Sequence, residues 1–211
     1  VAPVLLVLGA CADDVTAPAA PGGVRGAVVA SALRTDRLAT VEWEGRFPRL
    51  YLQDADGARR VRVRFENVHD KIEGNWTPEF LPVNDQSVIA MSTPAWSPDG
   101  QQLAVVVSVA YDQSQVIVMN ADGRQLRTES MNGQVIMGRV DWSPDSRRIA
   151  YAMSTQARGQ GVDLFVTDLV TERVQRLTTD GRFRAFDRYR WDAAGRGIWF
   201  TNFERWSDDG W

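Results

Sequence analysis

Few side chains in this chain have the types and spacing that catalysis requires. The 211 residues contain one histidine, His69, and one cysteine, Cys11. A Ser-His-Asp triad needs a histidine held by supporting groups, and His69 lies in a polar stretch without them. The chain has no Gly-x-Ser-x-Gly nucleophile elbow, no Cys-x-x-Cys pair and no phosphate-binding glycine loop. We therefore expect no enzyme activity and no cofactor.

Aspartates are the remaining candidates for a metal site. A calcium ion requires several oxygen ligands that converge on one point. The candidate aspartates are spread over expected loops and strand ends, where the capping of turns explains them more simply. We expect no metal site at these residues, which are Asp112, Asp163, Asp168, Asp180 and Asp187.

The strongest pattern in the chain is a tryptophan-turn block that occurs three times. Trp96–Gly100 has the sequence Trp-Ser-Pro-Asp-Gly, Trp142–Ser146 repeats it with a final serine, and Trp191–Gly195 is a looser copy. The steps between the tryptophans are 46 and 49 residues. A repeat of ~40–50 residues is typical of a four-stranded propeller blade. We predict an all-β fold, a β-propeller of four-stranded antiparallel blades that is incomplete in this chain.

Short apolar runs bounded by turn residues follow each block and predict strands. The hairpin between the second and third strands after the first block ends in Asp122-Gly123, a strong hairpin signal. The expected strands are Leu103–Val107, Val116–Met119, Gln125–Thr128, Ile149–Met153, Val162–Val166, Arg173–Leu177 and Ile198–Phe200.

An earlier repeat lacks the tryptophan block but matches the last three strands of a blade. Its expected strands are Leu38–Trp43, Arg49–Gln53 and Arg59–Phe65, with an Asp-Gly turn before the third. In the third strand, arginines at 60, 62 and 64 alternate with apolar residues, so one face is charged. Such a strand suits the outer edge of a blade, where charge discourages edge pairing.

An insertion separates this repeat from the next. Gly57 and Gly123 occupy equivalent hairpin positions but lie 66 residues apart, so about 20 additional residues fall within 66–90. The insertion contains Trp76, His69 and the only lysine, Lys71. A binding loop and a surface excursion without a partner both remain open.

These repeats resemble the TolB-type propeller, a WD-like repeat, over about Leu38 to Trp211. The quoted features are the Trp-Ser-Pro-Asp-Gly block, two apolar strands, an Asp-Gly turn and Arg176-Leu177-Thr178. The family includes periplasmic TolB, many bacterial lipoproteins and the propellers of prolyl-oligopeptidase-type peptidases. The resemblance implies that the motif residues are structural. They are Trp96, Pro98, Asp99, Gly100, Trp142, Pro144, Asp145, Trp191 and Gly195.

Each motif residue has a physical role in such a blade. Pro98 presets φ for a tight turn, Asp99 bonds to nearby backbone and Gly100 tolerates positive φ. The tryptophans are expected to pack between blades, where each buries a large apolar area. A ligand cage formed by the tryptophans is the less favoured alternative.

The N-terminus resembles a bacterial lipobox. An apolar stretch runs into Leu8-Gly9-Ala10-Cys11, which makes Cys11 the lipidated residue. The stretch is only about 10 residues long, too short to span a bilayer as a helix. An ordinary secretory signal is the alternative. Residues 1–10 are thus expected to be part of a lipoprotein signal peptide and 11–24 a flexible linker.

Residues 25–211 are expected to form about three and a half blades, as a fragment of a longer protein. Propellers close with typically 4–8 blades, and no initiating methionine precedes Val1. With 24 basic and 27 acidic residues, the net charge of −3 gives no general attraction to nucleic acid.

Two functions from different classes follow from these observations. The first is a non-catalytic, membrane-anchored lipoprotein outside the cytoplasm, whose propeller binds an envelope protein or glycan. The second is the N-terminal gating propeller of a prolyl-oligopeptidase-like serine peptidase whose catalytic domain is absent from this sequence.

Overall fold

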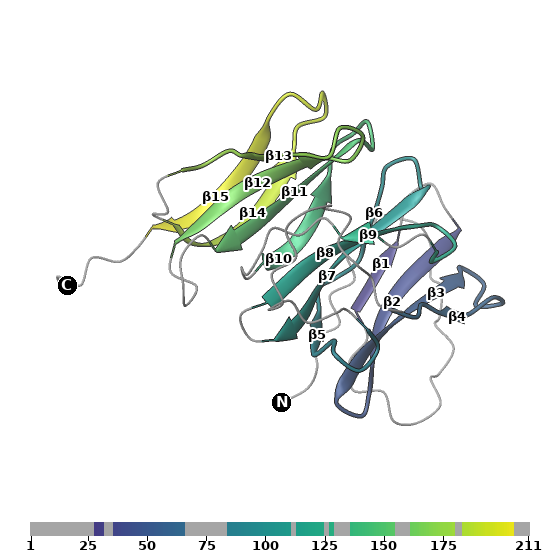
Figure 1. Ribbon diagram of the computed structural model, residues 1–211. Helices are drawn as coiled ribbons and strands as arrows, with labels where there is room; N and C mark the ends of the chain where they lie inside the picture. Colours follow the sequence, from purple (N-terminus) through teal and green to yellow (C-terminus); the bar gives the residue numbers. More distant parts are fainter. Residues whose placement is uncertain are drawn as a thin grey trace.

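The computed structural model describes residues 28–31, 36–65, 84–110, 113–124, 127–128, 136–154, 161–179 and 183–204. These residues form fifteen strands, and no helix is found among them. Cys11, the linker 11–24 and residues 66–83 of the insertion lie outside the described residues. Figure 1 shows the sheets in chain order, fanned side by side from β1 to β15.

The first blade is a four-stranded antiparallel sheet in the order β1-β2-β3-β4. Its strands are β1 Val28–Ser31, β2 Arg37–Glu44, β3 Phe47–Asp54 and β4 Val61–Arg62. The turn between β2 and β3 has Gly45 at φ 64°, and the Asp-Gly turn after β3 has Gly57 at φ 77°. Strand β1 supplies the innermost strand that the sequence pattern did not identify.

The second blade has an innermost strand in two pieces. Both β5 Ala90–Met91 and β6 Ala95–Trp96 pair with β7 Gln102–Ala110. Strand β7 pairs with β8 Gln113–Asn120, which pairs with the edge strand β9 Arg127–Thr128. The apolar runs predicted from the sequence lie inside β7 and β8.

The third blade contains β10 Ile136–Trp142, β11 Arg148–Ser154, β12 Val162–Asp168 and β13 Arg173–Arg176. A further hairpin follows, formed by β14 Phe183–Trp191 and β15 Ile198–Glu204. One residue pair, Val162 with Phe183, connects β14 to β12. Because β14 otherwise pairs with β15 alone, this hairpin is the beginning of a fourth blade rather than an extension of the third.

Apolar layers between neighbouring blades form the core. Strand β7 is buried on both faces: Leu103, Val105 and Val107 face the first blade, whereas Ala104 and Val106 face the third. Strands β11 and β12 alternate in the same way, with one face in the layer shared with the second blade and the other in the layer shared with β14. The predicted all-β propeller of four-stranded antiparallel blades is confirmed.

Candidate functional site

The tryptophan blocks form tight turns at the ends of the innermost strands. In the first block, Ser97 Oγ donates to Asp99 Oδ1 at 2.6 Å and accepts a bond from Gln102 N at 2.9 Å. Gly100 N donates to Ser97 O at 2.9 Å, with Gly100 at φ 71°. Pro98 is exposed at the tip of the turn. The polar groups of the block are thus used to close its own turn.

The second and third blocks close their turns in related ways. Ser143 Oγ donates to Asp145 Oδ1, which lowers the pKa of Asp145 below its ordinary value. Ser146 takes the glycine position of the turn at φ 59°, after the exposed Pro144. In the third block, which has no serine or proline, Asp192 Oδ1 accepts Arg196 N at 2.8 Å. Gly195 has φ 66° there.

The three tryptophans lie in successive layers between blades. Trp96, Trp142 and Trp191 are 8%, 6% and 8% exposed, and each ends the innermost strand of its blade. Trp142 Nε1 donates to Ala95 O of the second blade at 2.9 Å. The Arg148 guanidinium lies 4.5 Å above the Trp191 ring. The rings are therefore packed against protein, which leaves no open aromatic cage at these positions.

The turns of neighbouring blades are also joined to each other. Asp99 N donates to Ser146 Oγ at 3.1 Å, and Arg148 Nη2 donates to Gly195 O at 2.8 Å. Arg37 Nη1 donates to Ala121 O at 2.7 Å between the first and second blades. These bonds join the turns of neighbouring blades to one another.

The candidate aspartates do not form a site. Asp168 caps the turn after β12, accepting Thr171 N at 2.8 Å and Val170 N at 2.9 Å, and these bonds lower its pKa. Asp112 and Asp180 lie outside the described residues, as does the side chain of Asp187. Within the described ranges no group of three or more His, Cys, Asp or Glu side chains is arranged to hold a metal ion.

The interpretation of Asp163 as a turn cap is wrong. Asp163 lies inside β12 with a fully buried side chain. Arg176 Nη2 donates to its Oδ2 at 2.5 Å, and Thr178 Oγ1 donates to its Oδ1 at 2.7 Å. The Arg-Leu-Thr motif thus supplies the partners of a buried carboxylate.

Sequence reasoning missed a second carboxylate on an innermost strand. Asp141 in β10 is half-buried, and its Oδ2 accepts Trp191 N at 2.9 Å, which joins the third blade to β14. Burial raises the pKa of Asp141, while that bond and the charges of Arg139 and Arg190 oppose the increase. A bulge between Met137 and Asp141 sets this geometry, and nothing in the repeat pattern predicted it.

An open cleft of about 630 Å³ lies between the first and second blades. Its polar walls are the turn after β3 and the first tryptophan block. Arg37 inside it is already engaged with Ala121 O and lies 3.6 Å from Asp54. The cleft is lined by Asp36, Arg37, Asp54, Ala55, Asp56, Gly100, Gln101 and Ala121.

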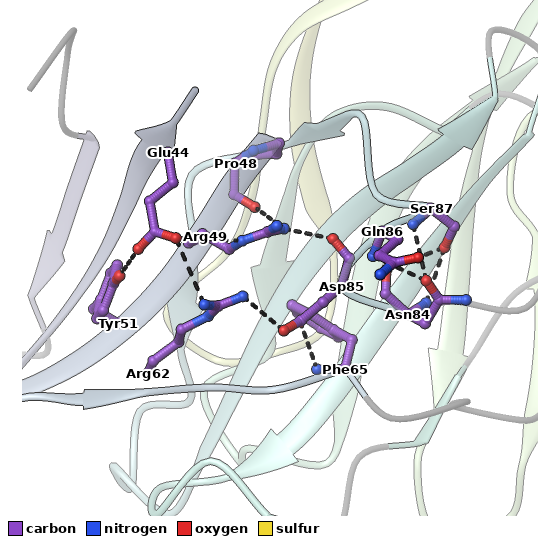
Figure 2. A network of polar contacts seen from close by, with 10 residues as sticks. All are labelled: Glu44, Pro48, Arg49, Tyr51, Arg62, Phe65, Asn84, Asp85, Gln86 and Ser87. Carbon is purple, nitrogen blue, oxygen red and sulfur yellow. Dashed lines mark hydrogen bonds and ion pairs between the residues drawn. The ribbon is translucent and has the colours of Figure 1, made fainter. Parts of the chain in front are cut away.

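The face of the first blade that is turned away from the second blade carries a polar network (Figure 2). Glu44 accepts the Tyr51 hydroxyl and lies 3.5 Å from Arg62, which in turn donates to Asp85 at 2.7 Å. Arg49 Nη1 donates to Asp85 O at 2.5 Å. Burial, together with the bond to Glu44, raises the pKa of Tyr51. Four of its members, Glu44, Arg49, Arg62 and Asp85, are charged.

The network depends on a short segment that follows the insertion. Asp85 N donates to Phe65 O at 3.2 Å and Asp85 Oδ1 accepts Phe65 N at 3.1 Å. Asn84 and Ser87 close the turn around Asp85 with reciprocal bonds of 2.9–3.1 Å. The described end of the insertion, residues 84–87, therefore contacts the first blade. No helix in the described ranges is long and apolar enough to cross a membrane.

Comparisons with known proteins identify the fold. No family model matches the sequence, and no curated protein matches it. Among solved structures, TolB from Acinetobacter baumannii is similar at a TM-score of 0.55 and 19% identity, covering 82% of this chain and 36% of that one. Putative TolB from Agrobacterium tumefaciens is similar at a TM-score of 0.50 and 20% identity, covering 78% of this chain and 50% of that one. A structure from an analysis of two prolyl endopeptidases is similar at a TM-score of 0.54 and 16% identity, covering 86% of this chain and 27% of that one.

These matches show a β-propeller fold similar to that of TolB. The chain spans about a third of the length of the A. baumannii TolB chain that it matches. At such identities the likeness concerns the fold alone, so the binding surfaces must be argued from this chain's own residues.

Proposed function

We propose that this TolB-like propeller is a non-catalytic binding scaffold of the bacterial cell envelope, held at a membrane by a lipid on Cys11. The observation that supports it best is the structural similarity to TolB together with the lipobox-like sequence before Cys11. The repeat-motif side chains close turns and fill the layers between blades. Recognition then falls to exposed blade faces and turns, with an envelope protein or glycan as partner.

The anchor has a direct test. Each buried CH₂ adds ~0.8 kcal/mol of membrane affinity, so two or three acyl chains on Cys11 would anchor the protein stably. The natural full-length protein and its Cys11→Ser variant are expressed in a bacterial host with a clickable palmitate analogue. Labelling and detergent-phase partitioning of the wild type alone are expected. Equal behaviour of the two proteins contradicts the anchor and leaves a secreted propeller.

The scaffold role has a separate test. A photo-crosslinking amino acid is placed in living cells at exposed positions on different blades, such as Arg64, Gln101 and Arg173. A binding scaffold gives a crosslinked envelope partner from one surface and not from the others. Crosslinks at similar low yield from every position contradict a defined binding surface.

A second candidate function is the gating propeller of a prolyl-oligopeptidase-like serine peptidase. The similarity to the prolyl endopeptidases supports it, since 86% of this chain is matched. Sequencing the locus beyond Trp211 distinguishes the two functions. A following hydrolase domain with a Gly-x-Ser-x-Gly elbow supports the peptidase, whereas further blades followed by a stop codon support the scaffold.

A further inference from the structure

The second and third blades each bury one face against the blade before them. Strands β7 and β8 pack apolar side chains such as Val105 and Ile117 against the first blade, and β11 and β12 pack Tyr151 and Phe165 against the second. The first blade lies at one end of the row of sheets, and its equivalent face is turned away from the second blade (Figure 1). In a closed ring of blades this face meets the last blade.

This face of the first blade is charged where the next two blades are apolar. Tyr51 occupies the position of Ile117 and Phe165, as the pairing of each with its outer strand shows. Around Tyr51 lie five guanidinium groups and three carboxylates. We call this surface the closing face. Its charged members are Arg46, Arg49, Arg60, Arg62, Arg64, Glu42, Glu44 and Asp85.

The carboxylates neutralise only part of the positive charge of the closing face. Glu42 lies 2.7 Å from Arg60, and Glu44 lies 3.5 Å from Arg62. Among the residues that the structure describes, exposed Arg46 and exposed Arg64 form no ion pair. Two guanidinium groups at this face can therefore accept a further carboxylate partner.

Aromatic rings hold several of the guanidinium groups at the closing face. The Arg60 guanidinium lies 4.1 Å from the Tyr51 ring centroid, and that of Arg46 lies 5.1 Å from the Phe47 ring centroid. A stacked guanidinium keeps its N–H groups at the edge, where they can bind a carboxylate. The positive charge is thus part of the surface that a covering blade would contact.

Covering the closing face has an electrostatic cost that the layers between the described blades do not have. A charge that leaves water without a partner is strongly unfavourable. A last blade as apolar as the covering face of the third blade would leave the excess guanidinium groups unpaired. Carboxylates on that blade would instead form charge-assisted hydrogen bonds with them.

We propose that the ring closes through an electrostatic seam, in which the last blade of the full-length protein presents Asp and Glu side chains to the closing face. The face continues the stacking of the described blades, and this chain covers only 36% of the A. baumannii TolB chain that it matches. The inference goes beyond the proposed function, because a scaffold and a gating propeller would both need a closed ring. Salt screens charge pairs, so this seam is the one that high salt loosens first.

The gene sequence beyond Trp211 supplies the first test. In the third blade, Ala152, Leu164 and Val166 face the blade that follows. The last blade should carry at least two carboxylates at or beside the equivalent positions. Apolar residues throughout this face, or a gene without further blades, overturn the proposal. In the crosslinking experiment described above, a probe at position 64 should react with the last blade of the same chain, and a crosslink from that position only to another protein counts against the seam.

Hydrogen exchange of the natural full-length protein tests the seam directly. Arg46→Glu/Arg64→Glu reverses the unpaired charges of the closing face. Arg147→Glu/Arg196→Glu reverses two exposed arginines on the turns of the third and fourth blades and is the control of equal net charge. Peptides spanning 37–65 report on the first blade, and peptides spanning 148–168 report on the third. Circular dichroism confirms that the variants fold, and the salt dependence of the wild type requires no variant.

In the wild type, added salt should accelerate exchange in 37–65 and leave 148–168 almost unchanged. At low salt, the closing-face variant should exchange about tenfold faster than the wild type in 37–65, and the control should match the wild type. Exchange in 37–65 that responds to neither salt nor the variant refutes an electrostatic seam, as does an equal response of the control. A Lys in place of the facing carboxylate of the last blade should slow exchange again in Arg64→Glu. No recovery in that charge swap would mean that the effect is confined to the first blade, against the proposal.

Discussion

The buried ion pair of Asp163 with Arg176 predicts an unequal response to loss of either partner. The Asp163 side chain is 0% exposed, whereas that of Arg176 is 39% exposed. Arg176 also donates to backbone carbonyls, with Nε to Thr178 O at 3.0 Å and Nη2 to Thr179 O at 3.2 Å. Without Asp163 the guanidinium keeps these bonds and its exposure to solvent, whereas without Arg176 the carboxylate stays in a buried position with the bond from Thr178.

Arg176→Met leaves the buried carboxylate with its ion pair removed. Breaking a buried pair in this way costs about 3–5 kcal/mol, and access of water from the arginine side reduces the expected cost to about 2–3 kcal/mol. Asp163→Asn keeps an oxygen for the Thr178 hydroxyl, so its expected cost is about 1 kcal/mol. The double variant should be less destabilised than the sum of the single variants by about 1–2 kcal/mol, because no charge is left buried.

Urea unfolding followed by tryptophan fluorescence measures these free energies. With a slope of about 2–3 kcal/mol/M, Arg176→Met should lower the unfolding midpoint by about 1 M. Arg173→Met on the same strand is the control, because Arg173 is exposed and forms no ion pair within the described residues. It should shift unfolding by at most about 0.5 kcal/mol. An Asp163→Asn cost equal to or above that of Arg176→Met would refute the reasoning.

Three further predictions follow from single contacts. Trp142→Phe removes a hydrogen bond between blades, whereas the Nε1 of Trp96 has no partner in the described part of the structure. Trp142→Phe should therefore cost about 1 kcal/mol more stability than Trp96→Phe. Equal costs in urea unfolding would contradict this prediction. Gly123 has φ 78°, and Gly123→Ala places a Cβ 3.0 Å from Val63 Cγ2, so it should cost about 2–4 kcal/mol of stability. Gly57 has a similar φ of 77° but faces open space, so Gly57→Ala should cost only about 1–2 kcal/mol. A lower melting temperature for Gly57→Ala than for Gly123→Ala would contradict this prediction. The pKa of Asp168 is lowered, so its bonds stabilise the protein above pH ~4 and lose that effect as the pH falls further. The difference in unfolding free energy between wild type and Asp168→Ala should therefore shrink below pH ~4. A constant difference from about pH 7 to about pH 3 would argue against the cap.

The propeller could be predicted because its signals are local. Each tryptophan block contains within five residues the groups that close its turn, as the bonds of Ser97 and Asp99 show. The apolar runs after the first two blocks are buried on both faces, which makes them continuous in sequence. Strand β1 was not identified, because Val28–Ser31 has no turn block beside it.

The polar core could not be predicted, because its partners are distant in sequence. Asp163 lies between two apolar neighbours, and its cation comes from another strand 13 residues later. Asp141 faces a backbone amide 50 residues away across a layer between blades. Alternation of residue types predicts on which face of a strand a side chain lies, but it does not predict which charged side chain on that face forms an ion pair or hydrogen bond.

The alternating arginines at 60, 62 and 64, of which only Arg62 lies in β4, show how this limit applies to side-chain roles. The pattern at 60, 62 and 64 was interpreted as protection of a blade edge, and β4 is the edge strand of its sheet. Two of these arginines nevertheless pair inward, Arg60 with Glu42 and Arg62 with Asp85. Edge protection would need only exposed charge, so the inward pairs require a further reason.

Equivalent positions in two blades suggest that reason. Phe165 pairs with Arg176 in the third blade as Tyr51 pairs with Arg62 in the first, so Asp163 and Arg49 occupy the same blade position. The third blade places one carboxylate beside one guanidinium there and buries the carboxylate, while the guanidinium stays partly exposed. The first blade places two guanidinium groups together and takes its carboxylates from the end of β2 and from the turn at Asp85. The two blades thus neutralise charge at equivalent positions in different ways: the third uses one pair within the hairpin β12–β13, whereas the first uses a network whose carboxylates come from outside β3 and β4.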